Sequence, residues 1–241
     1  MSLPEVFPPL HPRPALRLAA ALGGTLWTMG ELGRTRTPRI SAHKWARRVL
    51  RTMGVEARLL APIPAGAQVW VSNHLSWLDP LIYLSLRPSA ALAKAEVAAY
   101  PLIGAGAMRI GLRFVDRANL FSRAAALRAM VRDLSAGEDF LLFPEGTTTS
   151  GEDLAPLYEG GLRMAHRLGV KLLPLRLASD DAHYPWIGDD SLVPHLKRVV
   201  QNRGTLVTVC PGPVLDPAQW PDEDLWVQAI RAHLSAPAAA A

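Results

Sequence analysis

The sequence predicts an α/β protein with a largely parallel sheet and helices on both faces. The first observation behind this prediction is the order of the segments, because apolar runs of strand length alternate with segments of helical length from residue 61 onward. The second is the length of 241 residues with 49% hydrophobic residues, which is enough to bury one sizeable core. The third is a change of composition near residue 60. We therefore expect a helical N-terminal segment over residues 1–60 and one α/β domain over residues 61–236.

The first 60 residues are basic and apolar. They hold ten Arg and Lys against three Glu, a net charge of +7, so that residues 61–241 carry −2 of the total of +5. A basic, apolar segment on a nearly neutral body is typical of an anchor for an anionic lipid surface rather than of a nucleic-acid groove. We therefore expect a membrane-surface partner and no nucleic-acid partner.

Two helices are expected within this segment. Residues 1–14 contain five prolines and are expected to be irregular. Residues 15–33 are apolar, but their uncharged core of thirteen residues, 18–30, is shorter than the roughly twenty that a membrane-spanning helix needs, so we expect it to lie in the membrane interface. Ser41 can cap a second helix with one apolar and one basic face, typical of a helix in the membrane plane. The alternative is a surface helix that packs on the body. The apolar positions are Ala42, Trp45, Ala46, Val49, Leu50 and Met53, and the basic positions are Lys44, Arg47, Arg48 and Arg51.

The body alternates strands and helices. Spacing and breakers predict strands at residues 68–71, 90–95, 112–116, 139–143, 170–177 and 205–209. They predict helices at residues 81–86, 97–110, 119–134, 160–168 and 222–234. Strands spaced by helices indicate parallel pairing, and in open sheets of this kind ligands bind at the carboxyl ends of the strands.

A histidine and an aspartate follow the first strand of the body. His74 and Asp79 lie in the turn between that strand and the helix that Pro80 opens. An imidazole with an ordinary pKa of roughly 6.5 can accept and return a proton near neutrality, and a carboxylate on its Nδ1 fixes the tautomer and stabilises the imidazolium. Taken alone, the spacing has a simpler explanation, a turn histidine beside a carboxylate at a helix N-terminus.

Three more polar clusters follow predicted strands. Lys94 closes the second strand of the body, and Arg117 follows the third with a planar guanidinium that suits phosphate. Residues 144–150 place a carboxylate, a glycine and four hydroxyls after a buried strand. Taken singly, these clusters are an edge lysine, a surface ion pair and a turn. If the sheet is parallel, all of them share one edge with His74, and that convergence indicates a site.

The sequence offers few residues that could bind a metal or act as a catalytic nucleophile. Cys210 is the only cysteine, which excludes an intramolecular disulfide and a cysteine metal site and fits a reducing, cytoplasmic setting. The sequence has no G-x-S-x-G elbow, no nucleotide-binding loop and no clustered metal ligands. His166, His183 and His195 are expected to be structural or solvated. We therefore expect no metal and no bound cofactor.

Together the polar clusters resemble those of the glycerolipid acyltransferases of the 1-acyl-sn-glycerol-3-phosphate acyltransferase type. Residues 73–79 match the N-H-x-S-x-x-D block of that family, and residues 111–117 match the block that ends in F-V-x-R. Residues 143–147 are F-P-E-G-T, the third block, and residues 170–174 are similar to the fourth, an apolar strand with a proline. Order and spacing agree over roughly residues 65–180.

The resemblance implies transfer of a fatty acyl group from acyl-CoA or acyl-carrier protein, as co-substrate, to the free hydroxyl of a lysolipid. The acceptor that it favours is 1-acyl-sn-glycerol-3-phosphate, which gives phosphatidic acid. It also implies that His74 is the general base and that Asp79 orients it. From the basic N-terminal segment and the reducing setting we expect a peripheral or monotopic protein at the cytoplasmic face of the cell membrane. The substrate-binding residues that the resemblance implies are Lys94, Arg117, Glu145, Gly146 and Thr147. Backbone N–H groups and Ser76 both remain candidates for holding the oxyanion of the tetrahedral intermediate.

One segment departs from generic members of the family. Residues 184–195 look like a segment of bacterial relatives, some of which acylate lyso-ornithine lipid. This likeness keeps lyso-ornithine lipid or another lysophospholipid as an alternative acceptor. The simpler interpretation of this segment is that Pro185 and Trp186 form an aromatic loop that packs on the sheet and does not contact a substrate.

Two further functions compete with acyl transfer. A hydrolase would use His74 to activate water, and acceptor-dependent release of the thiol separates it from a transferase. A noncatalytic lipid-binding protein is the other, and the intact pair of His74 and Asp79 argues against it.

Overall fold

The computed structural model describes residues 14–32, 38–95, 112–116, 118–188, 190–202 and 204–236. The strands are β1 (Val55–Leu59), β2 (Val69–Ser72), β3 (Ala90–Lys94), β4 (Leu112–Val115), β5 (Phe140–Leu142), β6 (Leu172–Ala178) and β7 (Thr205–Pro211). The helices are α1 (Pro14–Leu32), α2 (Pro38–Met53), α3 (Asp79–Leu86), α5 (Leu120–Ser135), α6 (Gly160–Arg167), α7 (Leu192–Gln201) and α8 (Glu223–Ser235), with a 3-10 turn at Pro217–Gln219.

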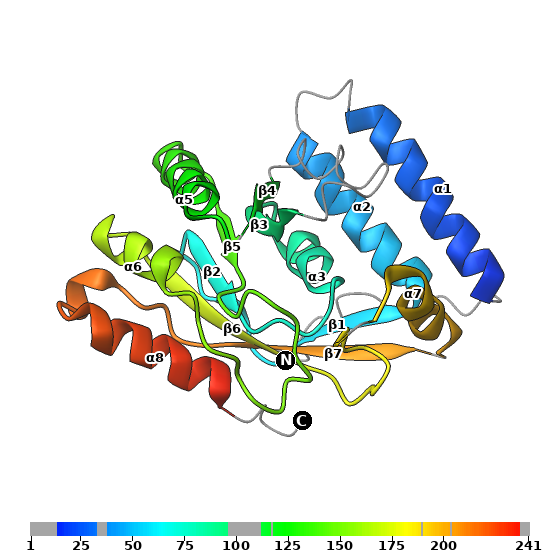
Figure 1. Ribbon diagram of the computed structural model, residues 1–241. Coiled ribbons are helices and arrows are strands. Elements are labelled where there is room, and N and C mark those ends of the chain that lie inside the picture. Colours follow the sequence, from blue (N-terminus) through cyan, green and yellow to red (C-terminus); the bar gives the residue numbers. More distant parts are fainter. Residues whose placement is uncertain are drawn as a thin grey trace.

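A single sheet forms the centre of the described chain (Figure 1). Its strand order is β1-β7-β6-β2-β5-β3-β4. The strands from β6 to β4 are mutually parallel, whereas β7 runs antiparallel to β6 and parallel to β1. The prediction of an α/β fold with a largely parallel sheet is therefore confirmed. Because parallel strands point the same way, the carboxyl ends of β2, β5, β3 and β4 lie at one edge.

The sheet separates two apolar cores. On β2, Val69 and Val71 pack into one core, and Trp70 between them packs into the other. The first core is completed by α5, α6 and α8, and the second by α2, α3 and α7, with α1 lying outside α2 (Figure 1). Successive residues of a strand face opposite sides, so a strand covered on both faces must be apolar throughout. Helices on both faces are thus confirmed.

The apolar face of α2 is buried inside the protein. Ala42, Ala46 and Leu50 have no exposed surface, and Met53 is 1% exposed, because α2 packs against α3 and the sheet. This supports the alternative of a helix packed on the body, and corrects the prediction that this face meets a membrane. The helix also begins before Ser41, which lies inside it and is not its cap.

The expected boundary at residue 60 does not coincide with the edge of the sheet. β1 lies before it and pairs with β7 in register from Val55 opposite Thr205 to Leu59 opposite Val209. The N-terminal helices are also tied to the body, since the buried guanidinium of Arg17 on α1 donates to the carbonyl oxygen of Val200 at 2.7 Å. In the described chain the first 60 residues thus supply an edge strand and two packed helices.

The other predicted elements of the body agree with the structure within two residues at each end, save the helix at residues 97–110, which lies outside the described residues. β1 and α7 were not predicted from the sequence. β1 alternates apolar and polar residues (V-E-A-R-L), a pattern typical of a half-buried strand, but it lies within the first 60 residues, where only helices were expected. α7 carries Pro194 in its first turn, where proline is tolerated but discourages a helix prediction. None of the helices in the described part of the chain is long and apolar enough to cross a membrane.

Candidate active site

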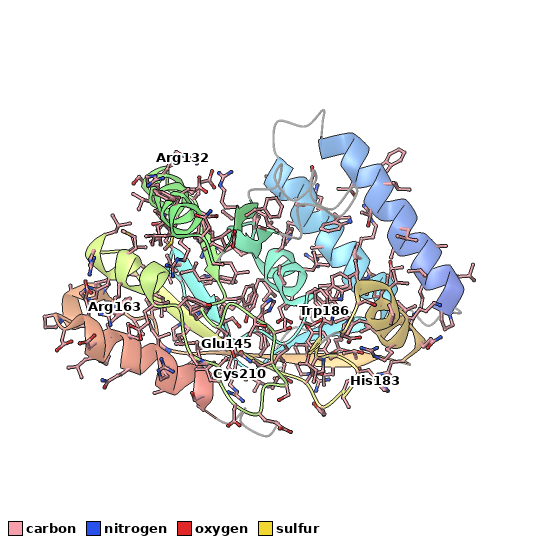
Figure 2. All side chains as sticks on the ribbon, viewed as in Figure 1. Arg132, Glu145, Arg163, His183, Trp186 and Cys210 are labelled. Atoms are coloured by element: carbon pink, nitrogen blue, oxygen red, sulfur yellow. The ribbon has the colours of Figure 1, made fainter. Side chains whose placement is uncertain are left out.

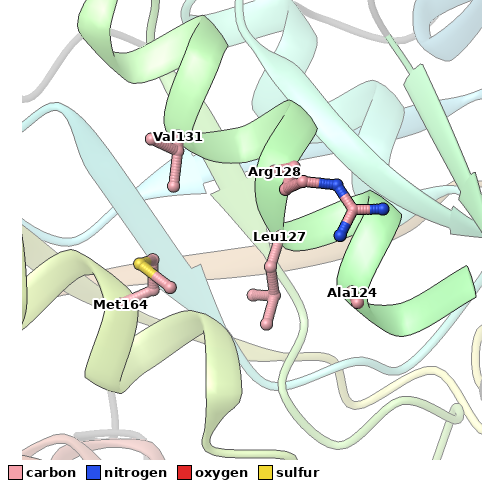
Figure 3. A pocket seen from close by; sticks show the side chains of 5 residues that line it. All are labelled: Ala124, Leu127, Arg128, Val131 and Met164. Atoms are coloured by element: carbon pink, nitrogen blue, oxygen red, sulfur yellow. The ribbon is translucent and has the colours of Figure 1, made fainter. Parts of the chain in front are cut away.

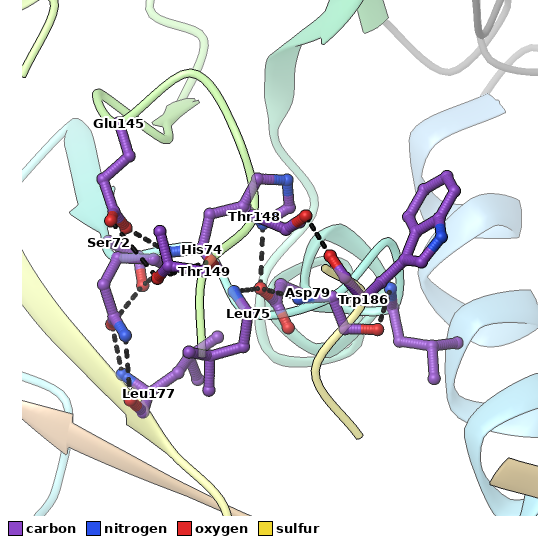
Figure 4. Close-up of polar contacts among 12 residues, drawn as sticks. Ser72, His74, Leu75, Asp79, Glu145, Thr148, Thr149, Leu177 and Trp186 are labelled. Atoms are coloured by element: carbon purple, nitrogen blue, oxygen red, sulfur yellow. Dashed lines mark hydrogen bonds and ion pairs between the residues drawn. The ribbon is translucent and has the colours of Figure 1, made fainter. Parts of the chain in front are cut away.

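The turn at residues 73–78 is fixed where it leaves β2. Asn73 is 2% exposed, and its side-chain amide donates to the carbonyl oxygen of Leu177 at 3.0 Å while its side-chain oxygen accepts the N–H of Leu177 at 2.7 Å (Figure 4). The amide side chain therefore extends the pairing of β2 with β6 by one step. No role for Asn73 was predicted from the sequence, although Asn73 directly precedes His74.

His74 and Asp79 are in direct contact at the end of β2. The Nδ1 atom of His74 lies 2.8 Å from Oδ2 of Asp79, whose side chain is fully buried, whereas the imidazole is 16% exposed (Figure 4). Oδ2 also accepts the backbone N–H groups of Leu75 at 2.6 Å and Ser76 at 2.9 Å. These donors hold the carboxylate as an acceptor, so the contact assigns the proton to Nδ1 and leaves Nε2 able to take a proton. The general-base role itself stays a prediction.

An aromatic ring fixes the other face of the imidazole. Phe143, directly after β5, stacks on His74 with ring centroids 4.2 Å apart and an angle of 22° between the planes. A ring that is stacked on one face and hydrogen-bonded at Nδ1 has little freedom to rotate. The adjacent strands β2 and β5 thus orient His74 together.

Glu145 joins the two loops that follow these strands. Glu145 is 3% exposed, and its carboxylate accepts the backbone N–H of His74 at 2.7 Å (Figure 4) and that of Ala155 at 2.9 Å. Burial raises the pKa of Glu145, and the backbone N–H groups of Ala155 and His74 oppose that effect. These contacts support a role in holding the His74 turn against its neighbour. Direct binding of substrate by Glu145 stays a prediction.

The remaining predicted binding residues that the structure describes lie at the same edge of the sheet. Gly146 has a φ of 69°, a conformation that favours glycine, and Thr147 beside it is exposed. The backbone of Lys94 ends β3 opposite Val115 of β4, and its side chain is not among the described ones. Arg117 lies outside the described residues. The backbone therefore brings the ends of these strands together, and the binding roles stay predictions.

The contacts of the turn narrow the choice of oxyanion donors. The backbone N–H groups of His74, Leu75 and Ser76 all donate to the carboxylates described above. The side chain of Ser76 is fully buried, and its hydroxyl oxygen accepts the N–H of Leu78 at 3.3 Å. The three backbone N–H groups are thus engaged in holding the turn and its carboxylates, and the full burial of Ser76 separates its hydroxyl from the exposed side of His74.

Tyr184, Trp186 and His195 pack directly on the His74 turn. The N–H of Trp186 donates to the carbonyl oxygen of Leu75 at 2.8 Å, and the hydroxyl of Thr148 donates to the carbonyl oxygen of Trp186 (Figure 4). Tyr184 reaches the second oxygen of Asp79 at 2.6 Å. No sequence spacing signals this last contact, because 105 residues separate its partners. Trp186 of the aromatic loop expected from the sequence thus packs on the site, and Tyr184 beside it lies in the core with residues of the sheet.

A shallow groove lies away from this site, between α5 and α6 (Figure 3). It has a volume of about 320 Å³ and is lined by Ala124, Leu127, Arg128, Val131 and Met164. It contains none of the predicted site residues.

The fold and the site define an α/β protein with a histidine–aspartate pair at the carboxyl edge of a mostly parallel sheet. The chain belongs to the acyltransferase family, since the family model described as Acyltransferase matches residues 54–178. The chain also resembles the crystal structure of the 1-acyl-sn-glycerophosphate acyltransferase PlsC from Thermotoga maritima, with a TM-score of 0.62, 18% identity, and coverage of 90% of this chain and 96% of that one. At that identity the likeness shows the fold alone.

Two relatives show how the chain compares within the family. It is 36% identical over 168 residues to a lyso-ornithine lipid O-acyltransferase of Pseudomonas aeruginosa, covering 67% of this chain and 65% of the relative. It is 28% identical over 157 residues to a 1-acyl-sn-glycerol-3-phosphate acyltransferase of Borreliella burgdorferi, covering 64% of this chain and 58% of the relative. The chain thus spans less than two thirds of the length of these curated relatives.

Proposed function

We propose that this protein transfers a fatty acyl group from the thioester of acyl-CoA or acyl-carrier protein to the free hydroxyl of a lysolipid. The observation that carries the proposal is the His74–Asp79 contact at 2.8 Å, held at the carboxyl edge of the sheet in a chain of the acyltransferase family. The imidazole is partly exposed, which lets a substrate hydroxyl reach it, and Nε2 is the ring nitrogen that the contact with Asp79 does not use.

The proposed reaction needs no nucleophile from the protein. Nε2 of His74 takes the proton of the acceptor hydroxyl as its oxygen forms a bond to the thioester carbonyl carbon. The tetrahedral intermediate then collapses, the carbon–sulfur bond breaks, and the imidazolium returns the proton to the leaving thiolate. Asp79 keeps Nδ1 protonated and stabilises the imidazolium between these steps.

Two acceptors are proposed for the lysolipid. The chemistry fits 1-acyl-sn-glycerol-3-phosphate, the acceptor that the sequence resemblance favours. Lyso-ornithine lipid is favoured by a different observation, the 36% identity to a protein of that name against 28% to the 1-acyl-sn-glycerol-3-phosphate acyltransferase of Borreliella burgdorferi.

Acceptor dependence tests the proposal. Purified protein is incubated with labelled acyl-CoA or acyl-carrier protein and, in turn, with each lysolipid or with none. We expect thiol release only with an acceptor, together with a labelled diacylated product. Equal thiol release without any acceptor would show a hydrolase, and no release with any donor and acceptor would show a noncatalytic lipid-binding protein.

We also propose that the protein binds the cytoplasmic face of the membrane through α1 and the basic side of α2. The exposed side of α1 is apolar, with Leu16 61%, Leu22 54%, Leu26 53% and Trp27 67% exposed. By the helical period, Leu22 and Leu26 lie on the side opposite the buried Arg17, and Leu16 and Trp27 lie at the flanks of that side. This apolar side can enter the interfacial region of a bilayer, which the buried face of α2 cannot do.

The basic residues of α2 supply the charge for that contact. They line a depression of about 520 Å³ whose lining residues are His43, Lys44, Arg47, Arg48, Arg51 and Thr52. Each basic residue near an anionic membrane surface contributes about 1 kcal/mol before salt screening. The apolar side of α1 and the basic side of α2 therefore act together in the proposal.

Charge reversal on α2 is expected to release the protein from membranes. The triple variant Arg47→Glu, Arg48→Glu, Arg51→Glu should lose cosedimentation with anionic vesicles at physiological salt, because attraction becomes repulsion. Turnover of a short-chain soluble acceptor should persist, since His74 lies on a different element.

A matched variant with the same change of net charge controls this experiment. Arg123, Arg128 and Arg132 are exposed on α5, and their reversal to Glu should leave vesicle binding in place. If the α2 variant still sediments fully with vesicles, the basic side of α2 is not the membrane contact. If the α2 variant also loses turnover of the soluble acceptor, α2 is required for the fold of the active site.

A further inference from the structure

The carboxylate of Asp79 is used at both of its oxygens. Oδ2 accepts Nδ1–H of His74 and two backbone N–H groups, as described above. Oδ1 accepts the hydroxyl of Tyr184 at 2.6 Å. Asp79 and Tyr184 both have no exposed surface, so water does not compete for this contact. A hydrogen bond from a hydroxyl to a buried carboxylate is among the stronger ones in proteins.

The hydroxyl of Tyr184 is available as a donor. Burial raises the pKa of Tyr184 well above its ordinary value, and the neighbouring charge of Asp79 raises it further. The hydroxyl therefore keeps its proton over the whole range of pH in which a histidine titrates. Because a carboxylate has no proton to give, the tyrosine must donate and Asp79 must accept.

The backbone of Tyr184 is held by the same turn that carries the catalytic pair. Nε2 of His195 donates to the carbonyl oxygen of Tyr184 at 3.0 Å, and Nδ1 of His195 accepts Nε1–H of Trp77 at 2.9 Å. Trp77 lies in the turn between His74 and Asp79. These contacts run from Trp77 through His195 to Tyr184 and back to Asp79, and they fix the position of the phenol relative to the carboxylate.

We propose that Tyr184 is a positioning residue for acyl transfer, which holds the Asp79 carboxylate in the plane and orientation that His74 requires and moderates its negative charge. The proposal rests on the proposed function of His74 as general base. Without the phenol, Oδ1 is left buried and unpaired, so the carboxylate can turn and its charge is shared by fewer donors. A less delocalised charge attracts the imidazolium more strongly. Tyr184 thereby adjusts the pH at which His74 becomes protonated as well as its orientation.

The other titratable groups around the pair help to isolate this effect. Glu145 accepts the backbone N–H of His74, and Tyr83 donates its hydroxyl to Ser72 at 2.6 Å close to Asp79. Asp190 and Arg198 lie near His195, which supports the backbone of Tyr184. Replacing Tyr184 by Phe leaves all of these groups in place.

The first variant removes only the hydroxyl. Tyr184→Phe should lower kcat about tenfold, the size expected when a group that orients a catalytic side chain is lost, with the KM of the acyl donor little changed. In a plot of kcat/KM against pH, the acidic limb should move to higher pH, because the Asp79 carboxylate without the phenol attracts the imidazolium of His74 more strongly. A role in folding alone would not move that limb.

Tyr83→Phe is the matched control. It removes one buried phenolic hydroxyl from a fully buried ring, but its partner is Ser72 and not Asp79. We expect Tyr83→Phe and Tyr184→Phe to lower the free energy of unfolding by similar amounts. The acidic limb of the pH profile should stay in place in Tyr83→Phe. Equal shifts of the limb in both variants would overturn the specific role of Tyr184.

A second substitution keeps the fold and changes only the strength of the contact. Incorporating 3-fluorotyrosine at residue 184 makes the phenol a stronger donor, so the acidic limb should move to lower pH, opposite to Tyr184→Phe. Titration of the His74 imidazole by ¹⁵N NMR follows the same shifts without any assay of turnover. If no acceptor is acylated but these NMR shifts appear, the proposed acyl transfer is wrong and the positioning of His74 by Tyr184 stands. If turnover is normal and neither substitution moves the titration of His74, the positioning role of Tyr184 is refuted.

Discussion

Replacing His74 by alanine is expected to abolish acyl transfer while the fold is retained. A general base contributes about 10²–10⁴ in rate, and the turn offers no second base, because Asp79 is fully buried behind the imidazole. The loss should appear in kcat with both acyl donors, measured as thiol release in the presence of acceptor. Retention of a tenth of the wild-type turnover would refute the role of His74 as general base.

The contacts of Asp79 explain why the fold should survive this change. After removal of the imidazole, Oδ2 still accepts the N–H groups of Leu75 and Ser76, and Oδ1 still accepts the hydroxyl of Tyr184. The buried carboxylate therefore remains satisfied. Circular dichroism and vesicle binding should be unchanged. His183→Ala is the control, because that side chain is exposed (Figure 2) and takes no part in the contacts of the turn described above, so its loss should leave turnover unchanged.

Replacing Asp79 by asparagine is expected to lower kcat by roughly a hundredfold or more. Three N–H groups point at Oδ2, so the amide is expected to keep its oxygen there, and the negative charge that stabilises the imidazolium is lost. In the opposite orientation the amide N–H faces Nδ1 and forces the wrong tautomer on the ring. Both orientations impair the proton transfer.

A carboxylate with a purely structural role provides the comparison for Asp79. Asp222 caps α8 by accepting the N–H groups of Asp224 at 2.7 Å and Leu225 at 3.2 Å. Asp222→Asn should therefore change the free energy of unfolding slightly and leave turnover unchanged. An Asp79→Asn protein with the turnover of wild type would mean that Asp79, like Asp222, only stabilises its helix start.

Much of the site followed from local patterns. The apolar run of β2 and the proline that opens α3 located the turn, and the five-residue spacing from His74 to Asp79 is short enough for one turn to bring the two side chains together. Parallel pairing then required the ends of β2, β5, β3 and β4 to meet, which the register confirms. Each of these inferences depends on neighbours in the chain or on a general rule of sheet geometry.

The sequence by itself therefore determined the fold class, the strand-turn-helix unit that carries His74 and Asp79, and the family. Only the tertiary structure decided which surface α2 covers, because one apolar stripe fits a bilayer and a protein core equally well. It also decided that β1 belongs to the sheet and that Tyr184 meets Asp79. The physical reason is the same in each case: these contacts join segments far apart in the chain, and no local periodicity records which distant surface a side chain will meet.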